Sequence, residues 1–207
     1  MTLLHDAAYA RLRHGRLVLI GGPGAGKTGA MILLLLEALR HRNQVSGPDR
    51  ADVPVPVPVW LTLGSWNPTA QGLREWVMAT AARDHSYLGA VDFGPDVIGQ
   101  LFDTGWVALF LDGLDEMPDN LRGRAMERLH AEAAGRRVVL TSRAHEYRAT
   151  LETGRDLPYA AVVELRPVPR GPPSTICWKV RSDQPGRRGS RSPTASAPTP
   201  VGCSLGR

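Results

Sequence analysis

Cysteine and lysine are both scarce in this chain of 207 residues, which contains two of each. The cysteines, Cys177 and Cys203, lie near the C-terminus and have neither the paired spacing of zinc ligands nor the density of a disulfide framework. Sparse cysteines without a disulfide pattern are typical of proteins in reducing compartments. The sequence therefore predicts a cytoplasmic protein.

Long apolar runs are also missing. The longest one extends from Ala30 to Leu36, far short of the roughly 20 residues that a membrane-spanning helix needs. Near the N-terminus, arginines precede only the short apolar run Leu17–Ile20 and then glycines, which does not fit a signal peptide. We therefore predict no membrane segment.

Positive charge is concentrated in one part of the chain. The formal net charge is +5, but residues 166–207 hold eight basic groups and one acid, which leaves a net charge of −2 for residues 1–165. A nearly neutral body gives no support to a specific nucleic-acid surface, so no such partner is predicted. One alternative stays open, in which the basic C-terminal stretch itself binds nucleic acid.

Short apolar runs alternate with stretches of helical periodicity, which predicts an α/β fold with a parallel sheet and helices on both faces. Strands are predicted at residues 17–20, 59–63, 107–111, 138–141 and 161–165. Helices are predicted at residues 27–42, 69–83, 95–104 and 120–134. The second strand follows Pro54, Pro56 and Pro58, which indicates a sheet edge.

The composition changes at Arg166. Of the 42 residues from there to the C-terminus, 19 are Pro, Gly or Ser, and the apolar periodicity stops. Such a segment cannot bury enough apolar surface to offset the entropy lost on ordering. We therefore predict one domain over residues 1–166 and a disordered tail over residues 167–207.

A glycine-rich run after the first strand matches the phosphate-binding loop pattern G-x-x-x-x-G-K-[ST]. The run consists of Gly21, Gly22, Pro23, Gly24, Ala25, Gly26, Lys27 and Thr28. We expect Gly21 and Gly26 to let the backbone turn tightly and approach phosphate oxygens. Amide groups from Gly24 to Thr28, at the start of a helix, are expected to point at a β-phosphate. Lys27 is expected to reach the β- and γ-phosphates, and the Thr28 hydroxyl to bind Mg²⁺.

Three acids follow the third strand, in the run Asp112-Gly113-Leu114-Asp115-Glu116. Asp112, at the carboxyl end of a buried strand beside the phosphate loop, is suited to hold Mg²⁺. Asp115 or Glu116 could orient and deprotonate an attacking water, and the sequence does not choose between them.

The fourth strand ends in Thr141-Ser142-Arg143. Hydroxyl and guanidinium groups at the end of such a strand are expected to lie at a γ-phosphate. Arg143 is therefore a further candidate catalytic residue.

Histidine and tryptophan side chains, which often take part in binding or catalysis, do not indicate a site in this sequence. The six histidines lack the spacing of metal ligands, and His145 is expected on a surface loop. Core or helix-packing roles are expected for Trp60, Trp66, Trp76 and Trp106.

Taken together, the three motifs resemble the NACHT family of signal-transduction NTPases, of bacterial type. The doubled acid after Asp-Gly-Leu is the distinctive form of that family's magnesium motif. The runs Val57–Leu61, Leu73–Trp76 and Val162–Leu165 are also similar to the family, and the resemblance covers about residues 12–167.

The resemblance implies a P-loop NTPase fold, a three-layer sandwich with a five-stranded, mostly parallel sheet. In that fold the Thr141 strand lies between the phosphate-loop strand and the Asp112 strand. It also implies ATP rather than GTP, and a switch that forms homo-oligomers when ATP is bound. Two absences from the sequence agree: no N-K-x-D motif for guanine is present, and no L-S-G-G-Q motif of transporter ATPases.

These observations predict a core that binds ATP and Mg²⁺ and hydrolyses ATP slowly as a signalling switch. The alternative is a catalytically unproductive nucleotide-binding fragment or regulatory remnant of a larger NACHT protein. Because the family pattern stops near Pro167 and no effector domain precedes the first strand, we expect a truncated or frameshifted reading of a longer protein. Long-read resequencing that finds an intact frame ending at Arg207 would contradict this expectation.

Overall fold

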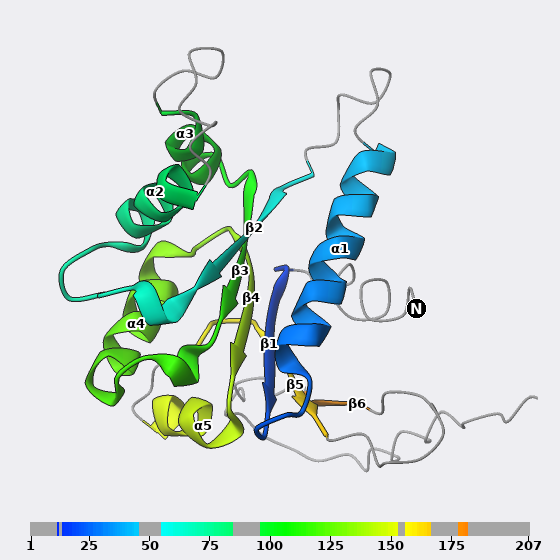
Figure 1. Ribbon diagram of the computed structural model, residues 1–207, viewed down its shortest axis with the longest axis vertical. Coiled ribbons are helices and arrows are strands. Elements are labelled where there is room, and N and C mark those ends of the chain that lie inside the picture. The colour runs from blue at the N-terminus through cyan, green and yellow to red at the C-terminus, as the bar shows by residue number, and fades with distance from the viewer. Residues whose placement is uncertain are drawn as a thin grey trace, which may run out of the picture.

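The structure is a computed structural model, and it describes residues 12, 14–45, 55–84, 96–152, 156–166 and, for the backbone alone, 178–181. Its strands form one sheet (Figure 1). In chain order the strands are β1 (Arg16–Gly21), β2 (Val57–Thr62), β3 (Val107–Asp112), β4 (Arg137–Ser142), β5 (Ala161–Leu165) and β6 (Trp178–Arg181).

Five of these strands run parallel, in the spatial order β2-β3-β4-β1-β5. The predicted α/β fold with a five-stranded, mostly parallel sheet is therefore confirmed. Strand β4 lies between β1 and β3, as the NACHT resemblance implied. All five strands consequently present their carboxyl ends at one edge of the sheet.

Helices cover both faces of the sheet, which makes three layers (Figure 1). Helix α1 (Lys27–Val45) lies on one face. The opposite face carries α2 (Leu73–Asp84), α3 (Val97–Asp103), α4 (Asp119–Glu132) and α5 (Ala144–Glu152). Two short 3₁₀ turns, η2 (Leu63–Ser65) and η4 (Leu114–Glu116), follow β2 and β3.

The two faces of the sheet supply two separate hydrophobic cores, because successive strand residues point to opposite sides. On the α1 side, Leu17 and Leu19 of β1 pack with Met31 and Leu34 of α1. On the other side, Val18 and its neighbours pack with the four remaining helices. Strand β1 is buried along its whole length, which accounts for its continuous apolar sequence.

Several elements differ from those that the sequence predicted. Helix α5 replaces the expected loop, so His145 lies in a helix, although it is exposed as expected. Strand β2 begins at Val57 and includes Pro58, which is tolerated because β2 is an edge strand. Helix α2 begins at Leu73 rather than near Thr69, because the preceding residues form a turn.

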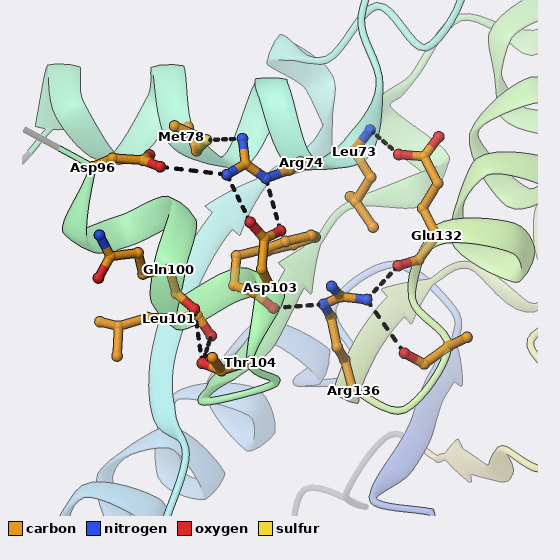
Figure 2. Close-up of polar contacts among 12 residues, drawn as sticks. Leu73, Arg74, Met78, Asp96, Gln100, Leu101, Asp103, Thr104, Glu132 and Arg136 are labelled. Atoms are coloured by element: carbon orange, nitrogen blue, oxygen red, sulfur yellow. Dashed lines mark hydrogen bonds and ion pairs between the residues drawn. The ribbon is translucent and has the colours of Figure 1, made fainter.

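A polar network fixes the helices α2, α3 and α4 to one another (Figure 2). Arg74 of α2 forms two hydrogen bonds with the carboxylate of Asp103 in α3, at 2.7 and 2.8 Å. These bonds lower the pKa of Asp103 from its ordinary value. Glu132 of α4 accepts a hydrogen bond from the backbone N–H of Leu73 at 2.7 Å, and this satisfies a free amide in the first turn of α2.

Four residues within the predicted disordered tail form a strand. Strand β6 pairs with β5 antiparallel, with Val163 opposite Val180 and Leu165 opposite Trp178. The sequence did not predict this strand, because its formation depends on the free edge of β5, which only the folded sheet provides. The other tail residues lie outside the described part of the chain.

The tryptophans only partly follow the expectation. Trp66 and Trp76 are buried and stack with ring centroids 5.0 Å apart, and Trp60 is partly buried beside the α1-side core. Trp106 is 40% exposed and so lies outside the core, which leaves only the helix-packing part of its expected role. Among the helices of the described residues, none combines the length and the apolar character required to cross a membrane.

Alkaline unfolding should report on the buried phenol of Tyr147. Burial among apolar side chains, with a smaller effect of Asp156, raises the pKa of Tyr147 to about 12. A raised folded-state pKa means that the stabilisation is complete below the unfolded pKa of roughly 10 and is lost as the pH rises toward 12. In urea titrations, we expect the free energy of unfolding of the wild type to fall by about 2 kcal/mol more between pH 9 and pH 11.5 than that of Tyr147→Phe.

The matched control is Tyr159→Phe. Tyr159 is 73% exposed, so this substitution removes a phenol that folding does not bury. This control should keep the wild-type pH dependence. Equal pH dependence for the wild type and Tyr147→Phe would contradict the burial argument.

Candidate functional site

The three motifs singled out by sequence meet at the carboxyl edge of the sheet. The parallel register pairs Leu19 of β1 with Thr141 of β4, and Leu111 of β3 with Leu140 of β4. The loop after β1 and the ends of β3 and β4 are consequently neighbours (Figure 1). Topology alone thus brings together residues more than a hundred positions apart.

The loop between β1 and α1 has an open, glycine-dependent conformation. Gly24 and Gly26 have φ angles of 70° and 85°, in the left-handed region that favours glycine. A Cβ atom added at either residue would meet no atom within 4 Å, so the space above the loop is free. The backbone amides of Gly26, Lys27 and Thr28 donate no hydrogen bond within the described residues, which leaves them available to an anion.

Lys27 is folded back over this loop. Its ammonium nitrogen Nζ donates hydrogen bonds to the carbonyl oxygens of Gly21 and Gly22, both at 3.2 Å. The positive charge of Lys27 and the free amides therefore belong to the same loop.

Gly21 has a different role from the one expected. It is the last residue of β1, and its φ angle is not in the left-handed region. A Cβ atom at this position would lie 2.7 Å from the carbonyl oxygen of Leu165 in β5. Glycine is needed there because β5 approaches closely, and the tight turn belongs to Gly24 and Gly26.

Asp112 is held by hydroxyl groups from two other elements. The Thr141 hydroxyl donates to Oδ1 of Asp112 at 2.5 Å and accepts a hydrogen bond from the backbone N–H of Gly113 at 2.9 Å. The Thr28 hydroxyl lies 3.3 and 3.5 Å from the two carboxylate oxygens. Thr141 therefore orients Asp112 rather than facing a γ-phosphate, and Thr28 of α1 reaches the same carboxylate.

The Thr28 hydroxyl and the Asp112 carboxylate supply oxygen atoms, which are the ligands that a hard divalent cation prefers. Two oxygens at adjacent corners of an octahedral Mg²⁺ site lie about 2.9 Å apart, given Mg–O distances of roughly 2.0–2.1 Å. The Thr28 hydroxyl and the nearer Asp112 oxygen are 3.3 Å apart, so the two side chains would have to move closer together to share an ion. No group of three or more His, Cys, Asp or Glu side chains gathers within the described ranges, so the ion would need further oxygens from a ligand such as phosphate.

Asp115 and Arg143 are bound to each other. Oδ2 of Asp115 lies 2.9 Å from Nε of Arg143, and Oδ1 accepts a hydrogen bond from the Arg143 backbone N–H at 3.1 Å. The Asp115 side chain is only 9% exposed, whereas that of Arg143 is 51% exposed. The Arg143 guanidinium is thus directed to Asp115, which differs from the expected orientation toward a phosphate.

Glu116 differs from its neighbour Asp115. It is exposed, and in the described part of the chain its carboxylate forms no ion pair. A Cβ atom built at Gly113 would lie 2.9 Å from its Cδ atom, so the carboxylate lies next to the turn that follows Asp112. Of the two acids, Glu116 is the one free to interact with a ligand.

Sequence reasoning did not identify Arg122 as part of this region. Its NH2 group donates to the carbonyl oxygen of Asp115 at 2.9 Å, and its NH1 group pairs with Asp119 at 2.9 Å. The spacing of Asp119 and Arg122 within α4 was visible in the sequence, but the contact with Asp115 depends on the packing of α4 against η4. Ser142 was expected near the γ-phosphate. It is instead fully buried, and its hydroxyl has no hydrogen-bond partner among the described residues.

Comparisons with known proteins do not extend this description. No protein-family model matches the chain, and no curated protein gave a significant match to its sequence.

Replacing Thr141 by valine should remove the hydrogen bond that joins the end of β4 to the Asp112 carboxylate. Valine keeps the shape of threonine but leaves the buried N–H of Gly113 without its partner and removes the short hydrogen bond to Oδ1 of Asp112. We expect Thr141→Val to lower the free energy of unfolding by about 1–3 kcal/mol in urea titrations. Thr141→Ser keeps the hydroxyl and should recover most of this loss, and equal stability of both variants and the wild type would contradict the assigned role.

Proposed function

We propose that this chain is a NACHT-type NTPase core that binds Mg·ATP and hydrolyses it slowly as a nucleotide-dependent switch. One observation carries the proposal: the Thr28 hydroxyl and the Asp112 carboxylate lie 3.3 Å apart, next to a loop with free amides and a lysine. This combination suits a phosphate chain with its cation.

The loop residues would bind the phosphate groups. The free amides at the start of α1 point their positive ends at an anion, and the helix dipole acts in the same direction. Lys27 would exchange its two bonds to loop carbonyl oxygens for bonds to phosphate oxygens, which are charged and bind an ammonium more strongly. Positioning and charge stabilisation are the main requirements of phosphoryl transfer.

Thr28 and Asp112 would hold the cation. When bound, Mg²⁺ supplies charge neutralisation on the phosphate oxygens. Thr141 fixes the orientation of Asp112 through its short hydrogen bond, so this carboxylate loses little freedom on binding.

Glu116 is our candidate for the base that orients and deprotonates the attacking water. Its carboxylate is exposed and unpaired among the described residues, whereas Asp115 already forms an ion pair with the Arg143 guanidinium and accepts a hydrogen bond from the Arg143 backbone N–H. Asp115 is accordingly a positioning residue for Arg143. Arg143 would stabilise charge on the γ-phosphate only after its guanidinium leaves Asp115.

The nucleotide is proposed to be ATP, since the sequence lacks the guanine-reading N-K-x-D motif. Assembly into homo-oligomers is part of the same proposal and rests on the family resemblance alone.

The second candidate function is nucleotide binding without productive hydrolysis. It is favoured by one observation, the bidentate contact that keeps the Arg143 side chain and backbone on Asp115. A chain that retains this contact with nucleotide bound would bind phosphate but stabilise the transition state poorly.

Two variants distinguish these functions. Lys27→Ala should weaken binding of Mg·ATP by about 10- to 100-fold, because hydrogen bonds to charged groups contribute roughly 1.5–3 kcal/mol. Glu116→Gln should keep the affinity and lower single-turnover hydrolysis by about 10²- to 10⁴-fold. Isothermal titration calorimetry and release of radiolabelled phosphate measure the two effects.

The control is Glu75→Gln, which removes an exposed acid of α2 on a helix remote from the loop. It should match the wild type in both assays. Hydrolysis that is negligible and equal in all proteins, with binding intact, would favour the unproductive module. Unchanged ATP affinity in Lys27→Ala would refute the phosphate site itself.

A further inference from the structure

Helix α1 exposes three large apolar side chains on one face. Ile32, Leu33 and Leu36 are 43%, 40% and 42% exposed. Leu36 follows the other two by four and three residues, so the three side chains are neighbours on the helix surface. Apolar side chains that are exposed singly need no explanation, whereas a contiguous group indicates an interaction site. We call these three residues the α1 patch.

The size of the α1 patch favours an occupant from the same chain. Among the described helices, α1 alone lies on its side of the sheet, so none of the others shields the patch (Figure 1). A stable contact between separate proteins takes about 20–30 residues on each side, far more than three. A tethered segment needs a smaller contact, because a short connection gives it an effective concentration in the millimolar range.

The chain reaches β1 from beside α1. Leu12 is partly buried and packs against the α1-side core, which contains Met31 and Leu34 of α1. The backbone N–H of Gly15 then donates to the carbonyl oxygen of Leu12 at 3.0 Å, which closes a turn that reverses the chain before β1. Because α1 also runs antiparallel to β1 (Figure 1), the residues before Leu12 approach it in the direction of α1.

The sequence of these residues is that of an amphipathic helix. No glycine or proline precedes Gly15. Apolar residues recur with the spacing of one helix face, at Leu3, Leu4, Ala7, Ala8 and Leu12, and the polar residues Thr2, His5, Asp6 and Tyr9 fall on the other face. A helix over residues 3–12 would be about 15 Å long, which exceeds the roughly 6 Å from Ile32 to Leu36.

We propose that residues 3–12 form a helix parallel to α1 and that its apolar face covers the α1 patch. Leu12 is the end of this contact that the structure already shows. Leu4 and Ala8, one and two turns before Leu12 on the same face, would continue it along α1 toward Leu36 and Ile32. The proposal does not depend on nucleotide binding, so either proposal can fail without the other.

The test measures how accessible the α1 patch is in the full chain. The chain has four isoleucines, so the δ1-methyl signal of Ile32 can be followed by nuclear magnetic resonance after isoleucine labelling. A neutral gadolinium chelate in solution relaxes exposed methyl groups. We expect weak relaxation of Ile32 in the wild type and a severalfold increase in Leu4→Gln/Ala8→Gln, because polar side chains would detach the segment.

The matched control is Thr2→Gln/Asp6→Gln, which alters only the polar face of the segment and should keep the wild-type relaxation. Ile20 is 5% exposed, so its methyl signal reports in every protein that the core is intact. Equal relaxation of Ile32 in the wild type and in Leu4→Gln/Ala8→Gln would overturn the proposal. Relaxation that rises when the wild type is diluted would also overturn it, since a second copy would then cover the patch.

A disulfide trap tests the orientation of the segment. In a chain with Cys177→Ser and Cys203→Ser, the pair Ala8→Cys/Leu36→Cys should form an intramolecular disulfide at least about tenfold faster than Asp6→Cys/Leu36→Cys, because Asp6 is on the opposite helix face. Electrophoresis without reducing agent separates this product from crosslinked dimers. Equal rates for the two pairs, or dimers as the main product, would contradict the proposed packing.

Discussion

The hydroxyl of Thr141 is the interaction on which the candidate site depends. It donates to Asp112 and accepts from the backbone N–H of Gly113, so one side chain of β4 fixes both the carboxylate and the turn that follows it. This is possible only because β4 lies between β1 and β3, which brings the end of β4 beside that of β3. Thr28 at the start of α1 reaches the same carboxylate across the end of β4. The order of strands is therefore a condition for the geometry of the candidate site as well as a feature of the fold.

Much of this arrangement could be predicted from the sequence, because it depends on local patterns. The run from Gly21 to Thr28 follows an apolar strand and precedes a helix, and parallel strands present their ends at one edge. Other features depend on contacts distant in sequence. Strand β6 forms on the free edge of β5, and nothing within residues 178–181 indicates that partner. Helix α5 has only nine residues and two buried side chains, Tyr147 and Thr150, too few for a clear apolar period.

The different roles of Asp115 and Glu116 could be assigned only from the structure. Asp115 and Glu116 are adjacent and chemically alike, so spacing could not distinguish them. The fold turns Asp115 toward Arg143 and leaves Glu116 exposed. From Arg122 through Asp115 to Arg143, a series of contacts joins α4 to the edge of the sheet that carries the loop. Under the proposed function, the rate of hydrolysis would depend on whether Asp115 retains Arg143.

The central claim is that the loop after β1 binds a polyphosphate chain together with Mg²⁺. The most direct measurement is a calorimetric comparison of ATP, ADP and AMP, each with and without Mg²⁺, on the full chain. The account predicts that ATP and ADP bind within about tenfold of each other, that AMP binds at least about a hundredfold more weakly, and that removal of Mg²⁺ weakens ATP binding. Equal affinity for AMP and ATP, or ATP binding that does not depend on Mg²⁺, would contradict it.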